Sequence, residues 1–280
     1  MRIITKILSG LITLSLLLSC TERIDLPLDE GNIKLVVEGA VTTESCVHSI
    51  YLTESTGYYY NQEPPAVIGA TVTITDGVSV FILSENSPGV YQTGSDFRGI
   101  EGREYTLNIK LLAPLGGFTE FTASSVINTP VILDSADLKF YEEFGEHGLW
   151  EVKCWFYDSL STDFYRFELY RNYHLITHKL GKWIVTDDKF FNGDYVNGGV
   201  ITYLDQNSEN EKLLPGDELI ITMGNIGREY FNFIQDAQSE LRGSNPLFSG
   251  PGANVRGNIS NGAIGFFAAY PVSLVKVIVP

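Results

Sequence analysis

Basic residues are scarce in this 280-residue chain. It has 19 lysines and arginines against 34 aspartates and glutamates, which gives a formal net charge of −15. Two of the basic residues, Arg2 and Lys6, fall within the first 19 positions, so the rest of the chain has 17 basic residues against 34 acidic ones. Such an acidic chain repels phosphate backbones, which argues against nucleic-acid binding.

The sequence also lacks the common motifs of catalytic and metal sites. It contains no G-x-S-x-G, C-x-x-C or H-E-x-x-H pattern. Of the four histidines, His174 and His178 are four residues apart, but they lie in a strand-like context where this spacing does not bring them to one helical turn. We therefore predict that the protein is not an enzyme and has no cofactor.

A glycine-rich segment, residues 243–262, is predicted to be a long loop. Gly257 and Gly262 are five residues apart, but Ala263 and Ile264 stand where a phosphate-binding P-loop needs lysine and serine or threonine. We expect these glycines to permit turns and close approach of backbones.

Residues 187–197 are rich in oxygen donors but do not follow the spacing of a calcium loop. The aromatic pair Phe190 and Phe191 indicates that this segment packs partly inward. We predict an ordered, turn-rich connection and no metal site. The donors are Asp187, Asp188, Asn192, Asp194 and Asn197.

Cysteine is rare, with three in the chain. Cys46 and Cys154 could pair in a compartment where disulfides form. However, Cys154 alternates with Trp150, Val152 and Phe156, a pattern typical of a small buried hydrophobic residue. Both alternatives remain open from the sequence.

The third cysteine, Cys20, ends an apolar run. The uncharged segment Ile7–Leu18 is shorter than the about 20 residues needed to cross a bilayer and is typical of a signal peptide. The run closes in "LLSC", which resembles a bacterial lipobox. We therefore expect residues 1–19 to be a lipoprotein signal peptide and Cys20 to be lipidated, with plain secretion as the alternative.

We expect residues 20–32 to form a tether, and apolar and polar residues alternate in the chain that follows. In "ATVTITD", Ala70, Val72 and Ile74 fall on one face and three threonines on the other. This period of two indicates half-buried strands. About seven short strands separated by turns such as Asp76-Gly77 predict an immunoglobulin- or transthyretin-like β-sandwich over residues 33–127.

A second β-rich domain is predicted over residues 131–280, after a proline-containing boundary. Apolar residues at three- and four-residue steps predict one amphipathic helix at about 226–242 within it. The later aromatics Phe266, Phe267 and Tyr270 are either sheet core or a contact strip. The predicted fold class is thus mostly β with one helix.

Three adjacent tyrosines form the most binding-like segment. Tyr58, Tyr59 and Tyr60 cannot all point inward, because neighbours alternate direction in an extended chain. Tyrosine gives large contact area at low entropic cost. We predict ligand or partner contact here, although two of the rings could instead cover the core edge.

Several segments together resemble the DUF4249 family of Bacteroidota lipoproteins. They include "IDLPLDEGNIKLVVEGAVTT", "PPAVIGATVTITD", "DDKFFNGDYVNG" and "NPLFSGPGANVRGNISNGAIGFFAAY". The family is largely uncharacterised and defines no catalytic residues. The resemblance implies an outer-membrane lipoprotein, often encoded beside TonB-dependent receptors of the SusC-like type, and so a non-enzymatic accessory to nutrient uptake.

The expected location is the cell outer membrane, reached through the lipid anchor. The acidic residues after Cys20 are spread out, which leaves the periplasmic and extracellular faces both open. A stand-alone glycan- or peptide-binding protein and an envelope hydrolase are the alternatives. The phylum's O-glycosylation pattern, Asp-Ser/Thr-apolar, is similar to the sequences at Ser135 and Ser159.

Overall fold

The computed structural model describes residues 33–56, 63–241 and 255–280, which belong to one compact unit, Asn32–Pro280. Their secondary structure is mostly β, with a single α-helix among the described residues. This confirms the predicted fold class. The immunoglobulin- or transthyretin-like type of the first domain stays a prediction.

Two sheets enclose the first hydrophobic core. Val72 and Ile74 of β3 are buried in it, as the alternation predicts, and Thr71 on the opposite face is exposed. One sheet has the order β16-β1-β2-β6-β5 and consists of β16 (Ile264–Tyr270), β1 (Leu35–Thr42), β2 (Ser49–Glu54), β6 (Val90–Gln92) and β5 (Ser84–Ser87). The other has the order β4-β3-β7-β8 and consists of β4 (Val80–Ile82), β3 (Thr71–Thr75), β7 (Glu104–Leu115) and β8 (Phe118–Val126).

The strand β16 comes from the far end of the chain, yet it completes the first sheet. It pairs in parallel with β1, in register from Val36↔Ile264 to Thr42↔Tyr270. Phe267 faces the first core, while Phe266 faces a separate cluster on the other side. The sequence prediction placed all of residues 131–280 in the second domain. The structure differs here because a strand with two apolar faces can be covered on both sides.

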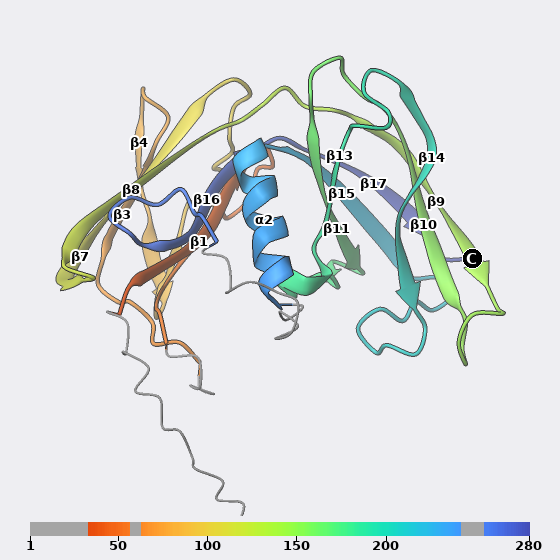
Figure 1. The fold of residues 1–280 in the computed structure, drawn as a ribbon, viewed down its shortest axis with the longest axis horizontal. Helices are drawn as coiled ribbons and strands as arrows, with labels where there is room; N and C mark the ends of the chain where they lie inside the picture. The colour runs from red at the N-terminus through yellow and green to blue at the C-terminus, as the bar shows by residue number, and fades with distance from the viewer. Residues whose placement is uncertain (1–32, 57–62, 242–254) are drawn as a thin grey trace, which may run out of the picture. The chain divides into compact units, whose positions relative to one another are not determined.

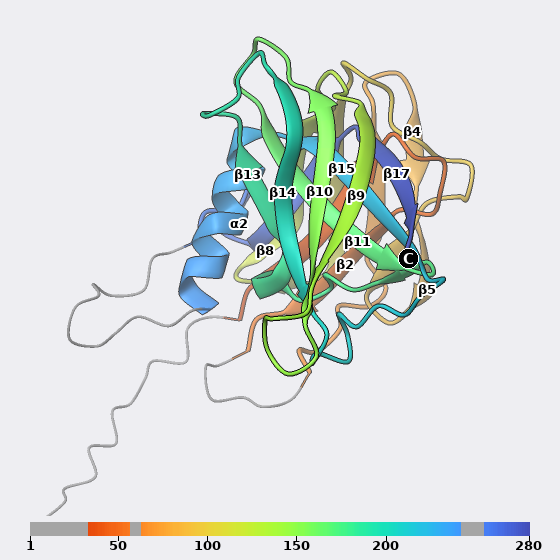
Figure 2. The same cartoon turned by 90° about the vertical axis from the view of Figure 1, so that its right-hand side faces the viewer.

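Two further sheets enclose the second core. Cys154 is wholly buried there, as its alternation predicts, and both Cys154 and the exposed Cys46 are free thiols. The first of these sheets, β14-β10-β9, consists of β14 (Tyr195–Asp205), β10 (Leu149–Tyr157) and β9 (Leu133–Tyr141), which run side by side in Figure 2. The second, β12-β11-β15-β17, consists of β12 (His174–Leu175), β11 (Phe164–Arg171), β15 (Glu218–Ile226) and β17 (Val272–Ile278), and β13 (Ile184–Asp187) also pairs with β11.

The helix α2 (Arg228–Leu241) covers the third cluster of buried side chains. Its apolar residues Tyr230, Phe231 and Ile234 pack with the outward face of β16 and with Phe164 at the start of β11. Figure 1 shows α2 between these strands. The helix confirms the prediction from three- and four-residue spacing and lies within the predicted limits.

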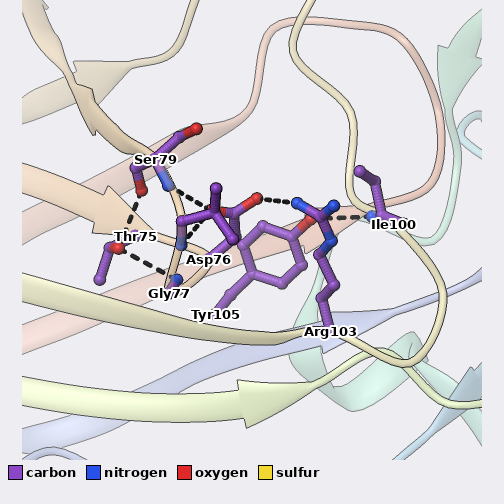
Figure 3. Close-up of polar contacts among 8 residues, drawn as sticks. Thr75, Asp76, Gly77, Ser79, Ile100, Arg103 and Tyr105 are labelled. Atoms are coloured by element: carbon purple, nitrogen blue, oxygen red, sulfur yellow. Dashed lines mark hydrogen bonds and ion pairs between the residues drawn. The ribbon is translucent and has the colours of Figure 1, made fainter.

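The turn after β3 is fixed by one carboxylate (Figure 3). Asp76 Oδ1 accepts hydrogen bonds from Ser79 N at 2.7 Å and Val78 N at 3.1 Å, and its Oδ2 forms an ion pair with Arg103. These contacts, led by the Ser79 amide, lower the pKa of Asp76. Gly77 follows with φ of +82°, a backbone conformation that favours glycine. The predicted Asp76-Gly77 turn is therefore confirmed.

Candidate functional site

A polar groove lies on the outer face of the β3-β7-β8 sheet. It has a volume of about 480 Å³. Most of its floor consists of side chains that alternate away from the first core on these three strands, and Ile109 and Phe121, which are buried in that core, also line it. The lining residues are Thr71, Thr73, Asn108, Ile109, Lys110, Glu120, Phe121, Thr122, Ser260 and Asn261.

One wall of this groove is the segment Asn258–Asn261, which runs along the free edge of β8. Ser260 N donates to Thr122 O at 2.9 Å, and Thr122 N donates to Ser260 Oγ at 2.8 Å. Asn261 Nδ2 donates to Glu120 O at 2.7 Å. These bonds satisfy backbone groups that an edge strand would leave open, and they fix the wall against the floor.

Gly257 holds this wall close to the first sheet. A Cβ at Gly257 would lie 1.8 Å from Gly265 O, so only glycine allows the two backbones to meet. Gly262, at the other end of the wall, has φ of +72° and open space around it. The structure thus confirms both roles predicted for these glycines, close approach at Gly257 and a turn at Gly262.

The groove chemistry is that of a polar binding surface. Lys110 Nζ and Glu120 Oε1 form an exposed ion pair at 3.1 Å, a contact that contributes little to stability. Around this pair lie threonine hydroxyls and asparagine amides, which can both donate and accept hydrogen bonds. Such a surface can bind a hydroxyl-rich or amide-rich ligand, such as a glycan or a peptide.

The predicted anchor and contact residues lie outside the described residues. This applies to Cys20 and to the segment Tyr58, Tyr59 and Tyr60. Of the two serines in the glycosylation pattern, Ser135 is exposed on β9. Ser159 is half-buried, and its hydroxyl donates to Asp163 Oδ2. The anchor, the contact role and the modification stay predictions.

Cys46 lies near His48, with Sγ and Nε2 3.9 Å apart. Although Cys46 as a residue is exposed, partial burial of its thiol, with a contribution from Glu44, raises the pKa of the thiol. Burial lowers the pKa of His48, whose Nε2 is 3.0 Å from Thr42 Oγ1. A reactive cysteine needs a lowered pKa, so this pair does not have the electrostatics of a nucleophile and its base.

The acidic segment after β13 is an ordered connection with turns, and one of its residues joins a cluster that its spacing does not reveal. Asn192, Asp194 and Asn197 are exposed, whereas Asp188 is buried together with Asp158 and Asp163. The ring of Phe191 packs inward against the second core, and Phe190 is exposed. The partners Asp158 and Asp163 are missed by the sequence reasoning because they lie on a different connection, between β10 and β11.

A buried arginine lies beneath α2. Arg166 donates to Tyr270 Oη at 3.0 Å and forms an ion pair with Glu168 Oε1 at 2.7 Å. Its guanidinium stacks on Trp183, 4.0 Å from the ring centre. Arg166 Nη1 also donates to Tyr230 Oη of α2 at 3.3 Å, so this buried residue connects α2, β11 and β16.

Fold and groove together define a mostly β protein with one helix and a polar groove on a sheet face. The chain belongs to the DUF4249 family, described as a domain of unknown function, whose model matches residues 21–274. No curated protein matches the chain. Among the described residues, no helix is long and apolar enough to span a membrane.

Proposed function

We propose that this protein is a lipid-anchored, non-enzymatic component of the outer membrane that assists a TonB-dependent, SusC-like nutrient-uptake receptor. The observation that carries the proposal is the lipobox-like "LLSC" ending at Cys20, with the compact body beginning at Asn32. We propose that the segment between them acts as a tether between the lipid and the β-rich body. The family resemblance supports the receptor as that partner.

The anchor is tested by acyl labelling in cells. Cys20→Ala should abolish the label and release the body from the membrane, because the acyl chains are attached through the thiol of this cysteine. Ser19→Ala is a matched control that keeps a small residue before the cysteine and should retain the label. Retained label in Cys20→Ala contradicts the lipobox interpretation.

The receptor association is tested by pull-down from detergent-solubilised envelopes. A TonB-dependent receptor should be enriched with the wild-type chain above the level found with Cys20→Ala. Absence of enrichment removes the accessory role. Protease shaving of intact cells, read by loss of the body, decides whether the protein faces outward.

A second candidate, a stand-alone glycan- or peptide-binding protein, is favoured by the groove. Asn108 and Asn261 stand on its floor and its wall and offer amides to a ligand. Purified protein should bind a ligand from a glycan or peptide array, and Asn108→Ala should weaken that binding while Asn207→Ala, on a distant exposed turn, should not. Tyr58, Tyr59 and Tyr60 changed together to alanine test the tyrosine segment in the same array.

A further inference from the structure

Three buried carboxylates meet at one end of the second core. Asp158 follows β10, Asp163 precedes β11, and Asp188 follows β13. They are 2%, 7% and 1% exposed, and one carboxylate oxygen from each lies within 4.8 Å of the other two. The pairing of Phe164 with Asp187 brings the ends of β11 and β13 together and so creates this approach.

No cation in the described part of the chain balances this charge. None of the three aspartates takes part in an ion pair there. The hydrogen-bond donors to these carboxylates are all neutral. Tyr165 Oη and Gly193 N donate to Asp158, and Asp163 N donates to Asp188. Two serine hydroxyls and the side-chain amide of Asn225 donate to Asp163. Buried charge without an opposite charge is unfavourable.

A fourth side chain contacts the cluster through its amide nitrogen and has an amide oxygen without a partner. Asn225 is 4% exposed and lies on β15, and its Nδ2 donates to Asp163 Oδ1 at 3.0 Å and to Thr129 O at 3.1 Å. Its Oδ1 is wholly buried and has no hydrogen-bond partner. Buried acceptors are nearly always satisfied. An amide that contacts Asp163 and leaves its own buried oxygen without a partner therefore indicates a missing electropositive partner.

We propose that Asp158, Asp163, Asp188 and Asn225 form a calcium-binding site. The available donors are all oxygens, which hard divalent cations prefer. Mg²⁺ usually keeps several waters and is bound through one or two carboxylates, whereas Ca²⁺ takes a larger set of carboxylate and amide oxygens. Three carboxylates with oxygens within 4.8 Å of one another therefore favour Ca²⁺.

Calcium at this point would connect the end of β10 to the other sheet of the second core, in which β11, β13 and β15 are already paired. The β10-β11 connection already contacts the connection after β13 through Gly193 N, which donates to Asp158 Oδ2 at 2.9 Å. Asn225 lies on β15 and also donates to Thr129 O, in the connection from β8 to β9. The site thus braces the second core, a role separate from the anchor and the receptor of the proposed function.

The test is calcium binding by the purified full-length chain in detergent. Its unfolding temperature is measured in a chelator, in Ca²⁺ and in Mg²⁺. Ca²⁺ at one hundred times its dissociation constant should raise this temperature by about 5–10 °C, with a smaller rise in Mg²⁺. Terbium luminescence gives a second measurement. Tyr165 donates a hydrogen bond to Asp158, so its ring is close enough to sensitise the emission of terbium bound at the site.

Asp188→Asn is the main variant, since an amide oxygen can still accept from Asp163 N while the charge is lost. Asp194→Asn is the matched control, because it makes the same change at an exposed position of the same connection. The calcium-dependent shift should disappear in Asp188→Asn and persist in Asp194→Asn. If Asp188→Asn does not fold, Asp158→Asn and displacement of terbium from the wild type by Ca²⁺ supply the answer.

Two results would overturn the site. One is a wild-type unfolding temperature that does not respond to Ca²⁺, together with terbium emission that Ca²⁺ does not displace, which would mean that protons hold the carboxylates together. The other is an equal calcium shift in the wild type and in Asp188→Asn, which would place the ion elsewhere. Neither result depends on the anchor or the receptor, so failure here is distinct from failure of the proposed function.

Discussion

Replacement of Gly257 by alanine should be among the most damaging single changes to the first core. The new Cβ would lie 1.8 Å from Gly265 O and 3.0 Å from Gly265 C, far inside the distance that real Cβ contacts keep. Gly265 cannot retreat, because its own Cβ position is 1.9 Å from Val37 O. We expect a loss of more than about 4 kcal/mol in the free energy of unfolding, measured by urea unfolding followed by tryptophan fluorescence.

Two other glycines separate this steric cost from the other effects of alanine. Gly227 has no atom within 4 Å of its Cβ position and does not have positive φ, but it precedes α2 and its carbonyl accepts from Phe231 N. Gly227→Ala should therefore cost only the weaker helix capping by alanine, up to about 1 kcal/mol. Gly262 has equal space but φ of +72°, so Gly262→Ala should cost about 1–2 kcal/mol. If Gly257→Ala unfolds at the same urea concentration as Gly227→Ala, the backbone contact described here is wrong.

Three further predictions concern the turn, the buried arginine and the first core. Asp76→Asn should lower the free energy of unfolding by about 1 kcal/mol at neutral pH. Because the pKa of Asp76 is below its ordinary 3.8, this difference should shrink as pH falls below 3.8, and urea titrations at several pH values measure it. Glu168→Gln leaves buried Arg166 without its anion and should cost about 2 kcal/mol, against less than about 0.5 kcal/mol for Glu120→Gln at an exposed pair; equal losses would contradict this account. Phe267→Ala should cost about 3–5 kcal/mol in thermal unfolding, since its ring is wholly buried.

The strands of the first domain could be predicted because their side chains alternate. On β7, Tyr105, Leu107 and Ile109 are buried and Asn108 between them is exposed, which is a direct consequence of the two-residue period. The helix α2 followed from its own period in the same way. A local pattern is enough to predict a helix or strand when one of its faces is buried and the other is exposed to solvent.

The partner of β1 could not be predicted by the same reasoning. β16 is apolar on both faces, so its sequence fits sheet core or a contact strip equally well and carries no information on which strand it joins. The parallel pairing depends on residues at opposite ends of the chain. Periodicity reports burial, whereas pairing over such a distance depends on the whole fold.

The candidate sites were harder to predict for a similar reason. The groove combines Thr71, Asn108 and Asn261 from three distant segments, and none of them belongs to a motif. Asp188 belongs to an acidic segment that is visible in the sequence. Its partners Asp158 and Asp163 lie near it only because β11 and β13 pair. A signal was present in the short segment from Asp158 to Asp163, which has an acidic residue at each end and two serines between them.

The position of β16 near the end of the chain determines when the first sheet can be completed. β16 pairs with β1 from Val36↔Ile264 to Thr42↔Tyr270, so the first sheet cannot be completed until nearly the whole chain has been made. Until then the β1 edge is open to any strand that reaches it, including one from another copy. Long-range closure of this kind slows folding. A chain truncated before Ile264 should therefore be prone to aggregate through its N-terminal half, even though that half contains most of its own strands.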